Sequence, residues 1–462
     1  MKKILTAVMA VICLTSLCAF PSCSFDTGKR DSTGDDDDWK NSFLDSMDSI
    51  DGDDSVEVTK HLRVSVLASD PNEYKTMSRW ATAYNMLHRD TEITVNNNMS
   101  DMKIVAQWHG TSSMPDIVWT AGDQHSYWSD IGYFEDLNKY LVGEDANYFD
   151  DFYSAIMDST HKSSTDDGIW FMPRDYNQIT FYVNATLLQV NGISVPTSSW
   201  TWEDVESICA QWKAKKPDRR YYPIEMDYSW NPLSVTFMKN FGASVYTDGQ
   251  LTARSDAMKA CLDYLNTAIS EKNYYSASST FDAGFSPLSI GVRPKLATTL
   301  AARPDDNIIC LPFPSTKVVP GTTTPTENGR GYVGVGCSGY AITAESSQTQ
   351  KDLAWDFLKF CMSERGYEVV GSLGTIVPAR ESLQDKGAWT EITNGVGTKI
   401  DPTAFTGGSA EPIGVNFADC LKPQYQANVG VYLINLFKAP GYDTYSYETA
   451  IKTFIDTIGN YN

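Results

Sequence analysis

The sequence predicts an α/β protein with more than one compact unit, in which mostly parallel sheets are flanked by helices. Short β-branched runs with alternating polarity are separated by longer segments whose apolar residues recur at helical spacing. This alternation is typical of β-α-β units, in which a parallel sheet carries helices on both faces. Roughly 400 residues follow the N-terminal region, and a single hydrophobic core rarely grows to that size.

The first residues have the pattern of an export signal. Met1, Lys2 and Lys3 precede an apolar stretch from Ile4 to Phe20, which falls short of the ~20 residues that a typical membrane-spanning helix needs. Ser22-Cys23 resembles the end of a lipobox. We therefore expect residues 1–22 to be a signal peptide and Cys23 to carry a lipid anchor, with plain secretion as the alternative. The protein is then an exported lipoprotein that faces the periplasm or the cell exterior.

Residues 23–56 predict a lipidated, acidic and disordered tether. Aspartates outnumber basic residues there and include the run from Asp35 to Asp38. One-sided charge and few apolar residues favour disorder, and the carboxylates lack the alternate spacing of a calcium loop. The net charge of −21 disfavours nucleic acid and anionic membrane surfaces as partners.

The nine cysteines indicate neither a disulfide framework nor a metal site. Those beyond Cys23 form no CxxC pair, and Cys209 and Cys361 lie on apolar helix faces, where a thiol packs as a small hydrophobe. Buried free thiols are therefore favoured over disulfides, which stay an alternative. The five histidines do not cluster near cysteines, so we expect no metal and no cofactor.

The globular part opens with a predicted β-α-β unit. Residues 61–67 alternate and predict a strand, residues 74–87 have helical periodicity, and residues 91–95 predict the second strand. Asp70 precedes the helix, where it is either a cap or a ligand-binding group.

The next predicted strand, residues 114–120, carries polar residues at its end. Asp123 and Gln124 follow it, and ligands of open α/β sheets bind beyond the carboxyl ends of strands. Residues 132–141 then predict a helix. Asp123 is the strongest acidic candidate for ligand binding in this half.

Residues 168–202 predict a crossing between two sheets. An apolar run at 169–172 breaks into Arg174-Asp175-Tyr176-Asn177 and resumes at 179–183, so the polar side chains are expected between the sheets. Asp175 and Asn177 are ligand candidates, although Asp175 also fits a turn or cap. Thr201 with Asp204 predicts a helix N-cap.

The second half continues the alternation of helices and strands. Tyr228 and Trp230 lie in a loop before a helix at 233–240, where an aromatic ring serves a ligand or anchors the loop. Arg293 ends a predicted strand at 285–292 and reaches a ligand or a surface partner. Further predicted elements are a helix at 256–271, a strand at 308–311, a glycine-rich crossing at 331–342, and helices at 354–361 and 446–458.

In this order the segments resemble the family 1 extracellular solute-binding proteins, the sugar-type receptors of bacterial ABC importers that include maltose-binding protein. The resemblance rests on Pro115-Asp116-Ile117-Val118, the crossing at 168–202, the glycine-rich segment, Ala354-Trp355 with its helix, and Val377-Pro378-Ala379-Arg380. Some positions depart from the family pattern. Gln124 stands where maltose-type receptors have arginine, and Asn177 stands where they have an acid. Members of the family often have a tryptophan just after the strand that corresponds to residues 285–292, and Arg293-Pro294 stands there in this sequence.

The resemblance implies a two-lobed fold like that of periplasmic binding proteins, with three hinge crossovers. They are expected near residues 172–177, near 334–338, and between 380 and 403. One lobe would comprise residues 57–173 plus 337–390, and the other residues 174–336 plus 391–462.

The resemblance implies that the protein delivers a carbohydrate, and specifically an oligosaccharide, to an ABC importer. The two lobes would close around this ligand. Carboxylates and amides accept hydrogen bonds from sugar hydroxyls, and aromatic rings stack on sugar faces. The implied partners are the solute and the permease subunits in the membrane, and the family default is a monomer. The ligand-binding set is Asp70, Asp123, Gln124, Asp175, Asn177, Tyr228, Trp230 and Arg293.

Two other functions share these features. A surface glycan-binding or sensor-input lipoprotein without a transport role would use the same fold. A secreted glycosidase is disfavoured, because no recognisable glycosidase setting, Gly-x-Ser-x-Gly or His-Glu-x-x-His pattern is present, and we expect no enzyme. The sequence does not name the solute.

Overall fold

The computed structural model describes residues 38–45, 56–163, 165–247, 250–277, 279–315, 332–384, 389, 396, 400–406, 409–412 and 429–459. The chain separates into two compact units, Met1–Ile50 and Asp51–Asn462. The predicted signal peptide and the predicted lipid anchor Cys23 lie outside the described residues.

The first unit contains one described helix, α2 (Asp38–Asp45). It falls within the stretch that was predicted to be disordered. Trp39 and Phe43 are four residues apart, and their ring centroids lie 6.5 Å from each other on the same side of the helix. This aromatic pair gives the acidic stretch a local apolar contact that the charge pattern did not indicate.

The first sheet of the larger unit has the order β2-β1-β3-β14-β4. Its parallel half contains β1 (Lys60–Leu67), β2 (Thr91–Met99) and β3 (Ile117–Ala121). Its antiparallel half adds β14 (Ser338–Ile342) and β4 (Met172–Pro173), which come from later parts of the chain. The predicted β-α-β opening is confirmed.

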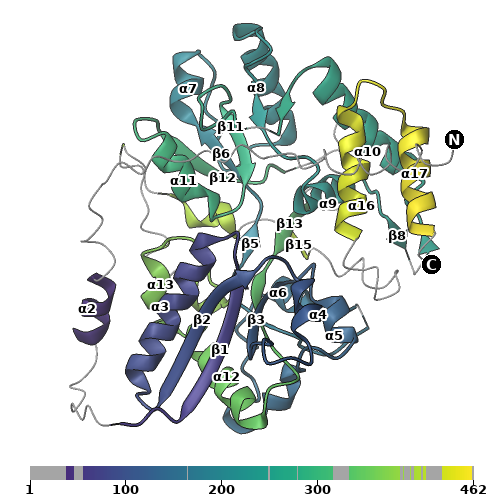
Figure 1. Ribbon diagram of the computed structural model, residues 1–462. Coiled ribbons are helices and arrows are strands. Elements are labelled where there is room, and N and C mark those ends of the chain that lie inside the picture. Colours follow the sequence, from purple (N-terminus) through teal and green to yellow (C-terminus); the bar gives the residue numbers. More distant parts are fainter. Residues whose placement is uncertain are drawn as a thin grey trace, which may run out of the picture. The chain divides into compact units, whose positions relative to one another are not determined.

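Helices α3 (Pro71–Leu87), α12 (Gln348–Cys361) and α13 (Glu364–Gly371) accompany this sheet (Figure 1). The apolar residues Met77, Trp80, Ala81 and Tyr84 of α3 recur at helical spacing and are buried, and Trp80 donates from Nε1 to the Gly366 carbonyl at 2.7 Å. Shorter helices follow along the chain. They are α4 (Ile104–Trp108), α5 (Ser126–Asp130), α6 (Ser154–Asp158) and the 3-10 turns η1 (Leu137–Tyr140), η2 (Gly143–Asp145) and η4 (Glu381–Leu383).

The predicted helix at 132–141 was wrong in its first half. Phe134 forms an isolated antiparallel bridge with Thr343, and the Glu135 N–H donates to the Ile342 carbonyl at 2.9 Å. These contacts hold residues 134–135 extended beside the end of β14, so only η1 is helical. A pairing partner about two hundred residues away is invisible to local periodicity.

The second sheet has the order β10-β7-β11-β6-β12. β10 (Tyr275–Ser276), β7 (Ile224–Glu225) and β11 (Leu288–Gly291) are parallel, whereas β6 (Thr180–Asn184) runs antiparallel to both β11 and β12 (Ile308–Pro312). Both sheets are therefore mixed, where mostly parallel sheets were predicted. The antiparallel pairings of the first sheet involve the strands next to the crossings, and those of the second involve β6, which directly follows the first crossing.

The helices of the second sheet enclose a large apolar core. Its buried members include Trp202, Trp212, Leu262 and Phe437. The helices are α7 (Ala185–Val190), α8 (Trp202–Lys215), α9 (Asn231–Asn240), α10 (Asp256–Asn266) with a π-helical turn η3 (Thr267–Glu271), α11 (Lys295–Ala302), α16 (Val429–Lys438), the turn η7 (Ala439–Gly441) and α17 (Tyr447–Gly459). A short hairpin, β8 (Tyr246–Thr247) and β9 (Gln250–Leu251), and the turn η6 (Pro402–Phe405) complete it.

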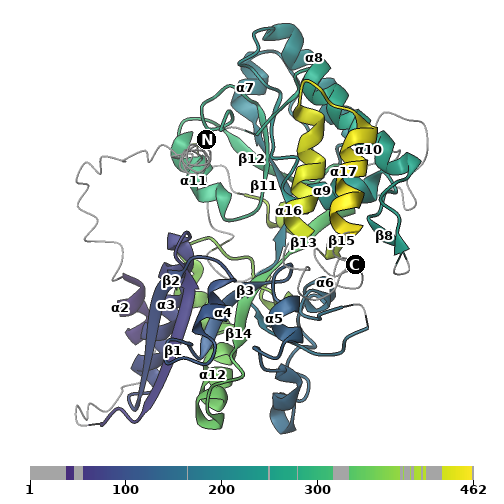
Figure 2. The same ribbon diagram turned by 45° about the vertical axis from the view of Figure 1, so that its right-hand side comes forward.

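A small third sheet contains the segments that lead from one large sheet to the other. β5 (Asn177–Gln178) lies between β4 of the first sheet and β6 of the second. β13 (Tyr332–Gly336) pairs with β5 and with β15 (Ser409–Pro412), and β14 of the first sheet begins two residues after it. Figure 2 shows these connecting strands from a second side. The stretch predicted for the third crossing falls largely outside the described residues.

The predicted cap at Thr201 is confirmed as a capping box at the start of α8. The Thr201 side chain accepts from the Asp204 N–H, and the Asp204 carboxylate accepts from the Thr201 N–H at 2.8 Å. We expect Thr201→Ala to lower the free energy of unfolding by about 1 kcal/mol, since one orphan donor of the first turn loses its acceptor. Urea unfolding measures this loss. Thr201→Ser keeps the hydroxyl and serves as the control, and an equal loss in both variants would contradict the cap argument.

Candidate functional site

The carboxyl end of β3 meets the junction between β13 and β14. The Gly122 N–H donates to the Cys337 carbonyl at 3.0 Å, and Asn177 of β5 pairs with Gly336. Asp123 follows directly, and its charge contributes to the raised pKa of the Cys337 thiol, whose main cause is burial. The structure therefore brings two predicted ligand residues, Asp123 and Asn177, to the two sides of the same junction.

Asp123 is open to solvent, yet its carboxyl group is crowded by protein. The side chain is exposed, whereas desolvation raises its pKa. A recessed position that is open on one side reconciles these two properties. Gln124, the next residue, is also exposed.

The side-chain amide of Asn177 has an unsatisfied hydrogen-bond acceptor. Its Oδ1 is buried and has no donor among the described residues. Asn231, which opens α9, has a buried Oδ1 in the same state. Buried polar atoms usually have partners, so each such oxygen marks a place where a water or ligand donor fits.

Gly334 brings the start of α9 against β13. A Cβ on Gly334 would lie 2.6 Å from the Pro232 carbonyl oxygen and 3.0 Å from Thr236 Oγ1, so only glycine lets the helix approach this closely. Trp230 is the N-cap residue of that helix. Since β13 also pairs with β5, the same strand contacts the helix of Trp230 and the strand of Asn177.

Tyr228 and Trp230 are both half-buried against the core of the second sheet. Desolvation raises the pKa of the Tyr228 phenol, and a Cβ on Gly441 would lie 2.5 Å from the Tyr228 oxygen. The loop-anchor interpretation thus fits Tyr228 closely. The ligand role of both residues stays a prediction.

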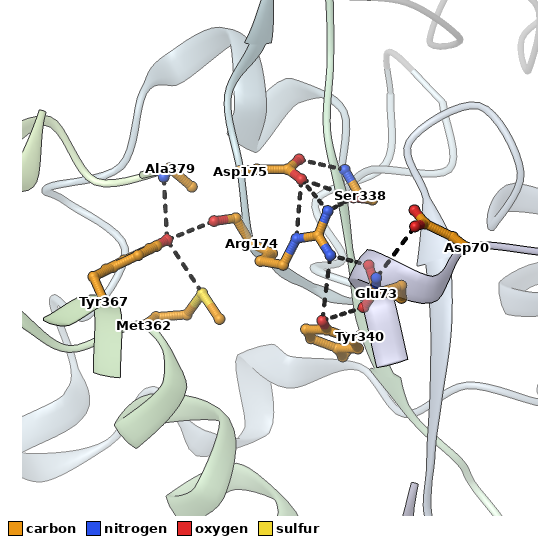
Figure 3. A network of polar contacts seen from close by, with 9 residues as sticks. All are labelled: Asp70, Glu73, Arg174, Asp175, Ser338, Tyr340, Met362, Tyr367 and Ala379. Atoms are coloured by element: carbon orange, nitrogen blue, oxygen red, sulfur yellow. Dashed lines mark hydrogen bonds and ion pairs between the residues drawn. The ribbon is translucent and has the colours of Figure 1, made fainter. Parts of the chain in front are cut away.

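Arg174 lies at the centre of a buried polar network (Figure 3). Its Nε donates to Asp175 Oδ2 at 2.9 Å, its Nη2 donates to Ser338 Oγ at 2.7 Å, and its Nη1 forms an ion pair with Glu73. Tyr340 donates to the other Glu73 oxygen at 2.5 Å. This network joins the start of α3, the first crossing and β14.

The charged groups of this network stabilise one another electrostatically. Desolvation is the main reason that the pKa of Glu73 is raised, and it is opposed by Arg174. Burial alone would lower the pKa of Arg174, but the carboxylates of Asp175 and Glu73 outweigh it and hold that pKa well above its usual range. One guanidinium thus compensates two buried carboxylates.

Two predicted ligand residues have structural partners here. Asp175 is fully buried and also accepts from the Ser338 N–H at 2.8 Å and from Ser338 Oγ at 2.9 Å. Asp70 caps α3, where its Oδ1 accepts from the Asn72 N–H at 2.9 Å and from the Glu73 N–H at 3.3 Å. Figure 3 shows the contact with Glu73. Asp70 thus fills the cap alternative named from sequence, whereas Asp175 has partners in Arg174 and Ser338 and not in a cap or turn. The ligand role of both residues stays a prediction.

Arg293 is 1% exposed, just beyond β11. Its Nη2 donates to the Trp389 carbonyl at 2.9 Å, and its Cζ lies 5.8 Å from the centre of the Phe405 ring. Desolvation lowers its pKa. The surface ion pair that was the alternative to a ligand role is excluded by this burial.

Several residues of the site were absent from the predicted set. Glu73, Ser338 and Tyr340 belong to the buried network, and Asn231 and Trp389 carry unpartnered polar atoms. Asn231 directly follows Trp230, so its loop position was the one signal available. The hydrogen-bond partners of Glu73, Ser338, Tyr340 and Trp389 lie far away in the chain.

A pocket of about 430 Å³ lies elsewhere, between α16 and α17, and none of the predicted ligand residues lines it. Its walls combine aromatic, hydroxyl and amide groups, including Tyr432, Asn435, Tyr442, Thr449 and Phe454. Tyr442 is 60% exposed. This pocket is separate from the residues around the β13–β14 junction.

The cysteines beyond Cys23 were predicted to be buried free thiols. Among the described residues, Cys209, Cys261, Cys310, Cys337 and Cys361 are buried free thiols, as predicted. The described ranges contain no group of three or more acidic, histidine or cysteine side chains placed to hold a metal ion. In the same part of the chain, no helix has the length and apolar character needed to cross a membrane.

The chain was compared with known proteins. Residues 79–394 match the family model described as bacterial extracellular solute-binding protein. No curated protein matches. The match covers more than half of the chain, so it establishes the family independently of the motifs.

Solved structures match over most of the chain. An ABC substrate-binding protein from Listeria monocytogenes in complex with cycloalternan shares 13% identity at a TM-score of 0.66, covering 87% of this chain and 98% of that one. UgpB from Mycobacterium tuberculosis in complex with glycerophosphocholine shares 15% identity at 0.67, covering 86% and 97%. A cyclo/maltodextrin-binding protein complexed with maltotetraose shares 14% identity at 0.66, covering 87% and 96%.

At such identities the similarity concerns the fold, an α/β arrangement of two lobes with helix-flanked sheets, as predicted except that the sheets are mixed and not mostly parallel. The predicted family is confirmed by the family match. This chain belongs to the bacterial extracellular solute-binding proteins.

Proposed function

We propose that this protein binds an oligosaccharide outside the cytoplasm and delivers it to the permease subunits of an ABC importer. Family membership supports solute binding, and similar folds are complexed with cycloalternan and maltotetraose. The observation that carries the proposal is the junction of β13 and β14, where Asp123 and Asn177 lie on two sides and the helix of Trp230 packs against Gly334.

These groups have the chemistry that a sugar needs. The Asp123 carboxylate and the Asn177 amide oxygen accept hydrogen bonds from hydroxyl groups, and the indole of Trp230 offers a flat apolar face for the C–H side of a sugar ring. Gln124 and Tyr228 add uncharged hydrogen-bonding groups beside them. Asp70 and Asp175 act through the segments that they hold in place.

The delivery step uses the crossings. The two lobes, residues 57–173 plus 337–390 and residues 174–336 plus 391–462, close around the solute as the connecting segments bend. The closed form then presents a surface that the permease recognises. The protein is an exported monomer, anchored through lipid at Cys23, and it releases the solute without chemical change.

A thermal-shift screen of the chain from Gly52 onward tests the ligand class. We expect one class of oligosaccharide to raise the melting temperature, because a ligand that binds only the folded state stabilises it by mass action. Asp123→Ala should weaken binding by roughly 10- to 100-fold, since a hydrogen bond to a charged group contributes about 1.5–3 kcal/mol. Trp230→Ala should also weaken binding, because the apolar face on which a sugar ring stacks is lost.

Glu92→Ala is the matched control. Glu92 is an exposed carboxylate at the start of β2, and it pairs with the equally exposed His61. Because β2 runs parallel to β1, Glu92 lies at the opposite edge of the sheet from Asp123. A stabilising polyamine, amino acid or non-sugar phosphate ester in place of every sugar would overturn the proposed ligand class.

A further inference from the structure

Arg293 is a buried cation whose charge has no counterpart in the described residues. Of its donors, only Nη2 has an acceptor, the Trp389 carbonyl at 2.9 Å. Nε and Nη1 are buried and unpartnered. No carboxylate of the described residues forms an ion pair with it, and burial lowers its pKa, opposed only by Tyr182 and Cys310. A buried guanidinium without an anion is unfavourable, so this arrangement needs an explanation.

A third unpartnered donor lies beside it. The Nε1 of Trp389 is buried and has no acceptor among the described residues. The Trp389 and Phe405 rings meet edge to face with centroids 6.4 Å apart, and the Arg293 Cζ lies 5.8 Å from the centre of the same Phe405 ring. Three donor nitrogens of the two residues packed against Phe405 therefore lack acceptors among the described residues.

Two polar neighbours of this group are already engaged, and Asp282, whose buried Oδ1 is unpartnered among the described residues, is not among the groups that act on the pKa of Arg293. The Tyr182 hydroxyl donates to the Val292 carbonyl at 2.7 Å. Asp401, which like Arg293 acts on the pKa of Cys310, accepts from the Thr403 N–H at 3.0 Å and the Thr403 hydroxyl at 2.8 Å. All the unsatisfied atoms on Arg293 and Trp389 are donors. Among the described residues, Arg293 and Trp389 therefore lack a negatively charged hydrogen-bond acceptor.

The donors lie at the crossover edge of the second sheet. Gly291, the last residue of β11, pairs with Thr180, the first residue of β6. Thr180 is three residues beyond Asn177, and its hydroxyl donates to the Ala404 carbonyl at 2.8 Å, next to Phe405. Arg293 thus belongs to the end of the sheet at which the chain enters from the first crossing.

We infer that the solute carries an anionic group, a carboxylate or a phosphate, and that Arg293 and Trp389 donate to it. Guanidinium is the side chain best suited to oxyanions, because it is always charged and directs several donors in one plane. The negative charge of the chain as a whole, −21, repels such a ligand, so local recognition has to supply the attraction. This inference rests on the proposed function, since it assigns a class of sugar to the same site.

Matched ligand pairs test the inference in the thermal-shift assay. Galacturonate oligomers are compared with their methyl esters, glucose 6-phosphate is compared with glucose, and inorganic phosphate is measured alone. We expect an acidic member to raise the melting temperature more than its neutral counterpart. The carboxylate and the phosphate pairs distinguish the two sources of negative charge.

The variants Arg293→Gln and Trp389→Phe assign the effect to these residues. Arg293→Gln should abolish the preference for the acidic member, and Trp389→Phe, which keeps an aromatic ring, should reduce it. The ligand-free melting temperature of Arg293→Gln should not fall, because the substitution removes an uncompensated buried charge. A clear fall in that temperature together with an unchanged preference would assign Arg293 a merely structural role and overturn the inference.

The remaining outcomes separate this inference from the proposed function. Equal or stronger binding of the neutral sugars overturns the anionic group and leaves carbohydrate binding intact. A shift with inorganic phosphate as large as that with any sugar supports the anion site and overturns the carbohydrate. An absence of any shift with every acidic probe overturns the inference.

Discussion

Replacing Arg174 with methionine is expected to lower the free energy of unfolding by about 3–5 kcal/mol, because it leaves two buried carboxylates without their cation. Glu73 and Asp175 are 2% and 0% exposed, so water cannot take over the lost interaction. Methionine fills part of the space without supplying a donor. The Ser338 hydroxyl and Tyr340 also lose the charge around which they are ordered.

Urea unfolding followed by tryptophan fluorescence measures this loss. The matched control is Arg220→Met, since Arg220 pairs with Asp218 on the surface with side-chain exposures of 71% and 46%. An exposed pair of this kind contributes at most about 1 kcal/mol. Combining Arg174→Met with Glu73→Gln should recover part of the stability. If Arg174→Met and Arg220→Met cost the same, the network has no special energetic role.

Replacing Gly339 with alanine is expected to cost about 3 kcal/mol or more, at the high end for an overpacked core position. A Cβ there would collide with the Met172 carbonyl oxygen and would lie 2.8 Å from Phe171 Cδ2. Gly339 pairs with Pro173 across the β14–β4 ladder, so those strands have to separate. Both strands lead into crossings, and the ligand site at the junction is therefore disturbed together with the fold.

Gly110→Ala separates the collision from the general cost of replacing glycine. Gly110 has a φ of +72°, but nothing lies within 4 Å of a Cβ placed there. Alanine at that position should cost about 1–2 kcal/mol through the left-handed backbone alone. Urea unfolding of both variants, with ligand binding of Gly339→Ala as a second readout, tests the argument. Similar losses in the two variants would show that the β14–β4 contact can relax.

Local pattern was sufficient for most helices and strands of the larger unit. Periodicity placed the first strand and α3, and Thr201 with Asp204 marked the start of α8, because caps depend on residues within one turn. The resemblance added the family, which the match over residues 79–394 confirms. The boundaries were less accurate. α12 begins at Gln348, six residues before the predicted start, since Ser347 caps it.

The candidate site was accessible to sequence reasoning only in part. Asp123 was expected at the end of a strand and Asn177 in a crossing, and both lie there because strand ends and polar breaks are local features. The state of each side chain was not accessible. Asp175 was expected to bind a ligand or to serve a turn or cap, and it lies fully buried against Arg174 and Ser338.

The distance along the chain between interacting residues explains which features could be predicted from the sequence. The order of elements, the acidic composition and the capped helix starts follow from residues close together in the chain, and they were predictable without coordinates. The Arg174 network joins residues 101 and 164 positions apart, and the Arg293–Trp389 contact spans 96. The mixed pairing of the sheets and the missing acceptor beside Arg293 likewise depend on which distant segments meet. Only packing in three dimensions sets those contacts, because burial and desolvation of a side chain depend on its neighbours in space and not on its neighbours in the chain.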